Sequence, residues 1–326
     1  MIDAFAHIVP PRHLARVEAR LQDWTPSERV KLYGSWLRES PVLSSLDERF
    51  RLLERFPGYR QVLVLGVFPL EELGIKGLSR EVNDELAELV STYPDRFAGF
   101  AAELDLNDVE ASLAELERAV RDLGALGFQI HTQVMGRPVD APAFEPVFAK
   151  AVELDCMIWL HPARSPIWPD YLSESESKYG IWWSLGWPYE TAAAMTRLVY
   201  SGHMERYPGL KVLTHHGGGM IPHFSGRLDT VQADDQIDAF ENVFKRPPLD
   251  YFRMFYADTA FFGAVHAARS SFEFFGADHV LFGTDMPLGG PDVIPATLED
   301  LRALSLGAED EAKVLHGNAE RVLGIR

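Results

Sequence analysis

The sequence is poor in cysteine and in basic side chains, and it has no long apolar run. Its 326 residues include 31 Lys and Arg against 48 Asp and Glu, which gives a formal net charge of −17 at pH 7. This balance argues against a nucleic-acid backbone or an anionic membrane as a partner. An anionic small molecule is not excluded, because one arginine or a metal ion can dominate the charge of a single pocket.

The single cysteine, Cys156, lies inside an apolar run and cannot form an intrachain disulfide. Such usage is typical of a reducing compartment, where the thiol is a small core residue. No apolar run approaches the about 18 residues that a membrane helix needs. The stretch from Met1 to His7 also lacks the basic region and the long apolar region of a signal peptide. We therefore expect a cytoplasmic protein.

Short apolar strands alternate with helices along the whole chain. We predict strands at residues 2–9, 61–67, 97–102, 128–131, 156–161, 211–216, 252–258 and 279–285, and helices at 47–56, 79–93, 107–123, 142–154, 190–204, 298–304 and 310–323, with one more ending at 272–276. This order is typical of a parallel sheet covered on both faces, and eight such units predict an α/β fold of the (β/α)₈ TIM barrel type. The first turn after a strand lacks a glycine-rich phosphate fingerprint, which disfavours a doubly wound sheet. A barrel of this size is one domain, so we expect a single domain over residues 1–326.

Two segments do not follow the alternation. Residues 12–45 contain Trp24, Trp36 and several prolines without a clean helical period, and we expect a long N-terminal excursion there. An insertion at 162–189 follows the fifth strand and holds Trp168, Tyr171, Tyr179, Trp182, Trp183, Trp187 and Tyr189. Aromatic rings suit a flat conjugated substrate, with Trp187 a candidate to bind it, but they are equally typical of a subunit contact.

In a barrel of this kind, the groups that carry chemistry stand at the C-terminal ends of the strands. The polar residues predicted there are His7, His131, His161, His215, His216, Asp258 and Asp285. His7, His161 and Asp285 are each the last side chain of a strand. Two neutral imidazoles and a carboxylate suit a divalent metal such as zinc and leave one coordination position open for a substrate oxygen or a water.

The pair His215 and His216 ends the sixth strand and is followed by three glycines. Successive strand residues point to opposite faces, so the two imidazoles serve different purposes. The glycines allow a sharp turn and a close approach of the backbone to a ligand.

Several stretches, taken in order, resemble the amidohydrolase-related decarboxylases, the group that includes aminocarboxymuconate-semialdehyde decarboxylase and resorcylate decarboxylase. They are Asp3–His7 (DAFAH), Trp159–Pro162 (WLHP), His216–Gly219 (HGGG), Gly283–Pro287 (GTDMP) and Gly317–Gly324 (GNAERVLG). The resemblance spans the chain. It implies a metal-dependent barrel that removes carbon dioxide from an aromatic or conjugated unsaturated carboxylic acid without an organic cofactor.

The resemblance also implies roles for single residues. His7, His161 and Asp285 correspond to ligands of a divalent metal, with Zn²⁺ expected first and Mn²⁺ next, and His216 corresponds to the catalytic acid and base. His215 has no role in the family pattern and is expected to pack or to support the ligands. Phe5 stands where the family carries a further ligand two residues before His7. The metal is then held more weakly, completed by another residue, or absent.

The mechanism implied places the substrate carboxylate on the metal while His216 protonates the carbon that bears it. Arg164 can pair with a second anionic group of the substrate or be a solvated loop residue. Asp258 can orient His216 or cap a loop, and Phe5 can exclude water or stack on the substrate. We expect a small-molecule carboxylate as partner and a homodimer or larger homo-oligomer.

Two alternatives stay open. A metal-dependent hydrolase of an amide, ester or lactone would use the same ligands, with Asp285 as the catalytic proton acceptor. A metal-free barrel that only binds a ligand is the second, and Phe5 is the reason to consider it.

Overall fold

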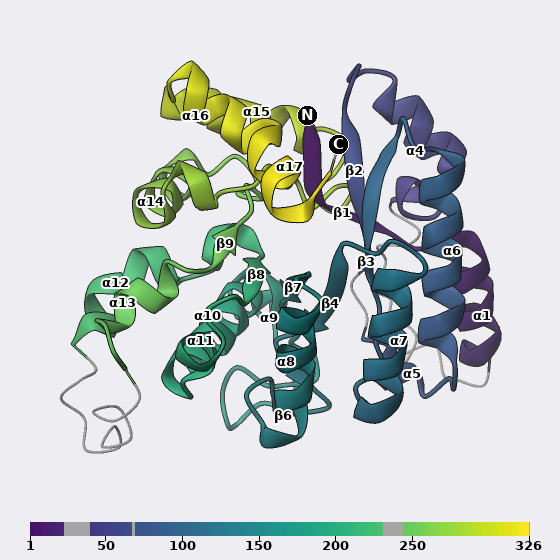
Figure 1. The fold of residues 1–326 in the computed structure, drawn as a ribbon, viewed down its shortest axis with the longest axis horizontal. Helices are drawn as coiled ribbons and strands as arrows, with labels where there is room; N and C mark the ends of the chain where they lie inside the picture. Colours follow the sequence, from purple (N-terminus) through teal and green to yellow (C-terminus); the bar gives the residue numbers. More distant parts are fainter. Residues whose placement is uncertain (23–39, 67–68, 231–243, 326) are drawn as a thin grey trace.

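A computed structural model describes residues 1–22, 40–66, 69–230 and 244–325 (Figure 1). Seven strands form one sheet in the order β1-β2-β3-β4-β7-β8-β9, and every neighbouring pair is parallel. Their bounds are Ile2–Ile8, Arg60–Leu65, Phe97–Ala102, Gly127–His131, Met157–His161, Lys211–Thr214 and Tyr256–Ala257. A small antiparallel pair, β5 (Gln133–Val134) with β6 (Arg137–Pro138), follows β4. The predicted α/β barrel class is confirmed.

Residues 280–286 lie between β9 and β1 and close the sheet into a barrel. On one side, Leu281 N donates to Ala257 O at 2.9 Å, and on the other, Asp285 N donates to Phe5 O at 3.0 Å. The segment therefore occupies the place of the predicted eighth strand and brings its last carboxylate to the end of β1.

This eighth segment differs from the prediction because it forms no regular strand and has only an isolated bridge to β9. Side chains form hydrogen bonds with some of its backbone N–H groups, in place of a continuous strand ladder. Gly283 N donates to Thr259 Oγ1 at 3.0 Å, and Thr284 N donates to Asp3 Oδ1 at 3.1 Å. The register of β1 against β2 also shifts between Asp3 and Ala6.

Helices surround the sheet on its outer side (Figure 1). The α-helices are α1 (Pro11–Leu21), α4 (Leu46–Leu53), α5 (Leu70–Leu73), α6 (Leu78–Thr92), α7 (Val109–Arg121), α8 (Glu145–Glu153), α9 (Ile181–Ser184), α10 (Gly186–Tyr200), α11 (His203–Arg206), α12 (Ile221–Asp229), α13 (Pro248–Phe252), α14 (Val265–Phe275), α15 (Val293–Leu304), α16 (Ala308–Ala312) and α17 (Asn318–Leu323). Among the helices in the described part of the chain, none has the length and apolar character required to span a membrane.

Buried apolar side chains form an inner and an outer cluster, and β7 shows the alternation that separates them. Met157 and Trp159 belong to the inner cluster, whereas Ile158 and Leu160 belong to the outer one, beneath the helices. The inner cluster also contains Leu323 of α17 and residues from the start of β1. The C-terminal helix therefore covers the barrel end at which the strands begin, and both chain ends lie there (Figure 1).

Two predicted segments differ in detail. Helix α1 occupies the first part of residues 12–45, and Trp24 and Trp36 lie outside the described residues. The predicted strand at 252–258 shrinks to β9, because α13 begins at Pro248 and includes Phe252 in its last turn. Proline suits the first helical position, since its fixed φ fits a helix and its missing N–H is not needed there.

Candidate active site

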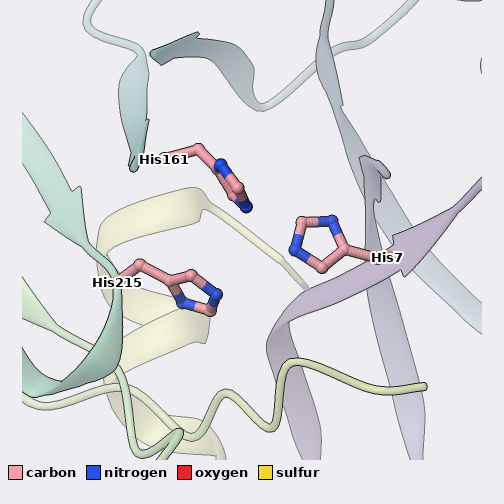
Figure 2. A group of neighbouring side chains, drawn as sticks. All are labelled: His7, His161 and His215. Carbon is pink, nitrogen blue, oxygen red and sulfur yellow. The ribbon is translucent and has the colours of Figure 1, made fainter. Parts of the chain in front are cut away.

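Four side chains from separate parts of the barrel meet at the C-terminal ends of the strands. His7 and His161 come from the ends of β1 and β7, His215 follows β8 directly, and Asp285 lies in the closing segment. Figure 2 shows the three imidazoles pointing toward one another. They converge because the carboxyl ends of parallel strands meet at one rim.

The facing atoms lie close together. His7 Nε2 lies 3.1 Å from Asp285 Oδ1, and His215 Nε2 lies 3.2 Å from the same oxygen. The three histidines each offer a ligand atom within 4.8 Å of the others. Within the described ranges, the Nε2 atoms of His7, His161 and His215 and Asp285 Oδ1 are buried without a hydrogen-bond partner. Two imidazole lone pairs, from His7 and His161, and the Asp285 carboxylate are a ligand set that suits a divalent metal.

Backbone carbonyls set the tautomers of two of these histidines. His7 Nδ1 donates to Leu65 O at 3.0 Å, and His161 Nδ1 donates to Pro162 O at 2.7 Å. A carbonyl only accepts, so each Nδ1 carries the proton and each Nε2 presents its lone pair to the centre. Burial, followed by the neighbouring histidines, lowers the pKa of His161 well below its usual range, which keeps this imidazole neutral.

His215 is held between two carboxylates. Its Nδ1 donates to Asp258 Oδ2, and the other oxygen of Asp258 accepts from Gly217 N at 3.0 Å and Ala260 N at 3.3 Å. Burial alone would lower the pKa of His215, but the charges of Asp258 and Asp285 outweigh it and raise this pKa to about 10. Burial likewise opposes ionisation of Asp285, yet His215 beside it holds the pKa of that carboxyl well below its usual range.

His216 lies beside the site in the glycine turn. Its ring stacks on His215 with centroids 3.9 Å apart, and its Nδ1 donates to Ala260 O at 3.3 Å. Burial, together with the charge of His215, lowers its pKa to about 4. The turn requires glycine, since a Cβ on Gly219 would lie 2.4 Å from the Pro188 carbonyl oxygen.

Phe5 packs against the other face of His215. The two rings are nearly parallel with centroids 4.0 Å apart, and Phe5 lies 5.4 Å from His7 and 6.1 Å from His161. Since His216 also stacks nearly parallel on His215, the three rings form one stack with His215 in the middle. Phe5 has no exposed surface and belongs to the inner cluster, so its ring supports a histidine of the site.

Trp187 contacts a histidine of the site, and Arg164 pairs with a neighbouring carboxylate. The Trp187 ring is buried and meets the His161 ring edge-on at 5.7 Å. Arg164 Nη1 pairs with Glu190 Oε1 at 3.2 Å, so an anion would compete with this carboxylate for the guanidinium. In the rest of the insertion, Tyr171, Leu172 and Tyr179 are exposed.

Three further polar residues lie beside these ligands. His131 of β4 has its ring 5.4 Å from that of His161, Gln129 precedes it on the same face, and Gln129 Nε2 donates to Glu103 Oε1 at 2.8 Å. Sequence reasoning placed His131 at a strand end without a role and missed the other two. The available signal was the spacing of two residues, which puts Gln129 and His131 on one face of an otherwise apolar strand.

Comparisons with known proteins agree with this geometry. Residues 71–325 match the amidohydrolase family model Amidohydro_2. The chain is 30% identical over 301 residues to gamma-resorcylate decarboxylase from Polaromonas sp. (strain JS666), covering 88% of this chain and 89% of that protein. It is 30% identical over 253 residues to 2-amino-3-carboxymuconate-6-semialdehyde decarboxylase from Dictyostelium discoideum, covering 76% and 67%.

A solved structure extends the likeness to three dimensions. The dihydroxybenzoic acid decarboxylase from Polaromonas sp. JS666, crystallised with manganese and the inhibitor 2-nitroresorcinol, superposes with a TM-score of 0.78 at 25% identity and covers 99% of this chain and 96% of that one. The fold, the converging ligand atoms and these matches agree, and the chain belongs to the amidohydrolase family.

Proposed function

We propose that this protein is a metal-dependent, non-oxidative decarboxylase of an aromatic or conjugated unsaturated carboxylic acid. The observation that carries the proposal is the meeting of His7, His161, His215 and Asp285 with their facing atoms unsatisfied. The family relatives named above, which are decarboxylases, support it. We further propose that residues 1–326 act as one domain.

His7, His161 and Asp285 would hold the metal, and no organic cofactor is needed. When bound, a divalent cation would supply a Lewis acid that fixes and polarises oxygens of the substrate. Imidazole ligands suit Zn²⁺, and a carboxylate also suits Mn²⁺, which a solved relative contains. Zn²⁺ is the first metal to test and Mn²⁺ the second.

His215 is placed to move the proton. Asp258 accepts a hydrogen bond from the Nδ1–H of His215, and Nε2 therefore faces the centre of the site. Transfer of a proton from Nε2 to the carbon that bears the carboxylate forms a C–H bond. The bond to the carboxylate then breaks, carbon dioxide leaves, and the electron pair restores the conjugated system. Solvent returns the proton to the imidazole.

His216 is the residue to which the resemblance assigns this step, and it lies on the face of His215 away from Phe5. Single variants separate the two. If His215 moves the proton, His215→Ala abolishes turnover at unchanged metal content, whereas His216→Ala keeps measurable turnover. The reverse pattern gives the role to His216. Loss of metal in proportion to activity would make the substituted histidine a ligand.

Trp187 would wall one side of a flat substrate, because its ring borders His161. Arg164 would bind a second anionic group only by leaving Glu190. Phe5 would act on the substrate through His215, on which it stacks.

Family membership also favours one alternative, a hydrolase of an amide, ester or lactone with Asp285 as proton acceptor. The test is a panel of hydroxybenzoates and lactones offered to protein loaded with Zn²⁺ or Mn²⁺. Carbon dioxide and the product lacking the carboxyl group are expected from an aromatic acid. Acid release from a lactone without carbon dioxide release would replace the decarboxylase with the hydrolase. Metal analysis of the purified protein tests the other alternative, a metal-free barrel that only binds a ligand.

We propose a homodimer or larger homo-oligomer, supported by the exposed side chains of Tyr171, Leu172 and Tyr179 in the insertion. Light scattering after size exclusion measures the mass directly. The buried free thiol of Cys156 supports a cytoplasmic location.

A further inference from the structure

Two polar atoms on β4 are buried without a partner. Gln129 is 3% exposed and His131 is 5% exposed. In the described part of the chain, neither Gln129 Oε1 nor His131 Nε2 has a hydrogen-bond partner. The intervening Ile130 belongs to the outer cluster, so the two polar side chains share the inward face of the strand. Buried polar groups are rarely left unpaired, and two on one face indicate a missing ligand.

The orientation of the Gln129 amide is fixed by its neighbours. Its Nε2 donates to Glu103 Oε1 at 2.8 Å and to Leu65 O at 3.4 Å. A carbonyl oxygen only accepts, so the amide nitrogen must lie on the Leu65 side and Oε1 is left over as an acceptor. Leu65 O also accepts from His7 Nδ1, so one carbonyl oxygen orients both the Gln129 amide and a proposed metal ligand.

His131 extends the same face toward the ligands. Its ring meets that of His161 edge-on, with centroids 5.4 Å apart. An imidazole nitrogen and an amide oxygen can both form hydrogen bonds with a hydroxyl group.

We propose that Gln129 Oε1 and His131 Nε2 form a subsite for a hydroxyl group on the substrate ring. The hydroxyl group donates a hydrogen bond to Gln129 Oε1. This inference rests on the proposed function. It assigns discrimination between hydroxylated and unsubstituted rings to β4. Glu103 is the positioning residue that holds the Gln129 amide.

The test uses metal-loaded protein and two acids that differ by one hydroxyl group, 2-hydroxybenzoate and unsubstituted benzoate. His131→Phe and Gln129→Met keep approximate volume and remove the polar atoms. His13→Phe is the matched control, because His13 is also 5% exposed and lies on α1, outside the barrel. KM and kcat are measured for both acids, and calorimetry measures the binding of both acids and of 2-nitroresorcinol.

We expect each β4 variant to weaken binding of 2-hydroxybenzoate about tenfold, the loss of one buried hydrogen bond, and to change binding of benzoate less than about twofold. Metal content and the control should match wild type. Equal losses for both acids, or loss of metal from His131→Phe, would overturn the subsite.

The proposed function fails separately, if wild-type protein binds these acids but releases carbon dioxide from neither. The calorimetric difference between the two acids then still decides the subsite. A wild-type protein that binds both acids equally would overturn it, because water alone would then satisfy the two atoms.

Discussion

Two rings and one carboxylate determine the orientation of His215. Phe5 and His216 cover the two faces of its ring, and Asp258 accepts a hydrogen bond from its Nδ1–H. Stacked aromatic pairs contribute about 0.5–1.5 kcal/mol beyond the area they bury. The ring of Phe5 therefore has a structural role, because it helps to fix the imidazole that faces Asp285.

We predict that Asp258→Asn lowers kcat by about 10- to 100-fold, the usual effect of losing a carboxylate that orients a histidine of a metal site. An amide can still accept from Nδ1 but stabilises a protonated imidazole less well. Metal content and melting temperature should change little, and steady-state kinetics with metal analysis measure both. An unchanged kcat would show that His215 needs no carboxylate behind it.

Phe5→His gives a second prediction for a single residue. The ring of Phe5 lies 5.4 Å from that of His7, so a histidine at position 5 can reach the same metal. We expect tighter metal retention in competition with a graded series of chelators, and lower activity because His215 loses its stacking partner. Phe5→Leu is the control, which loses the stack without adding a ligand. Equal retention in all three proteins would mean that position 5 points away from the metal.

Helix α1 shows how one element depends on another. It begins after Pro10 and has no side-chain cap of its own. Glu85 of α6 replaces that cap, since its carboxylate accepts from Arg12 N and His13 N, both at 2.9 Å. A negative charge at a helix start is favourable, because the unpaired N–H groups there carry partial positive charge.

We predict that Glu85→Ala lowers the free energy of unfolding by about 1–2 kcal/mol, as for the loss of an N-cap. Glu88→Ala is the matched control. Glu88 pairs with the Arg12 side chain at 2.7 Å, but both groups are well exposed, and such a pair contributes about 0–1 kcal/mol. Urea denaturation compares the two, and equal losses would show that Glu85 acts only as a surface charge.

His13 on the same helix predicts a pH dependence. Burial lowers its pKa to about 4 in the folded state, against about 6.5 when unfolded. Between these values the unfolded state binds more protons, so stability falls as pH falls from about 6.5 to about 4. Relative to His13→Phe, we expect wild type to lose up to about 3 kcal/mol over that window in urea titrations. A constant difference between the two proteins would contradict it.

The sequence predicted elements better than contacts between elements. The predicted strand at 156–161 and the predicted helix at 107–123 both follow from local sequence patterns, and the structure has them as β7 and α7. The Glu85 cap joins residues about 70 positions apart, and no local pattern indicates such a pair. The adjacent His215 and His216 were ambiguous for a related reason. Strand alternation separates their faces, but only the barrel decides that His215 shares the inner side with Leu213.

At the scale of the whole molecule, the closed barrel brings together residues that are far apart in the sequence. Backbone hydrogen bonds between the closing segment and β1 place Asp285 beside His7, although 278 positions separate them. The order of the strands and the polar residues at their ends were enough to predict that His7, His161 and Asp285 lie close together. They could not predict Glu103 or the Gln129 amide, because these act through hydrogen bonds that only the folded barrel forms.

Metal binding should therefore stabilise the whole barrel. The four facing atoms belong to segments spread around the barrel, and an unfolded chain does not hold them together. A ligand that binds only the folded state stabilises it by about 2.7 kcal/mol when its free concentration is 100 times Kd. We predict that the melting temperature rises with added Zn²⁺ or Mn²⁺ and falls back with a chelator. His161→Ala should abolish this dependence, whereas His203→Ala, a buried histidine of α11 outside the site, should retain it. A metal dependence that survives in His161→Ala would place the cation elsewhere and remove this cluster as the metal centre.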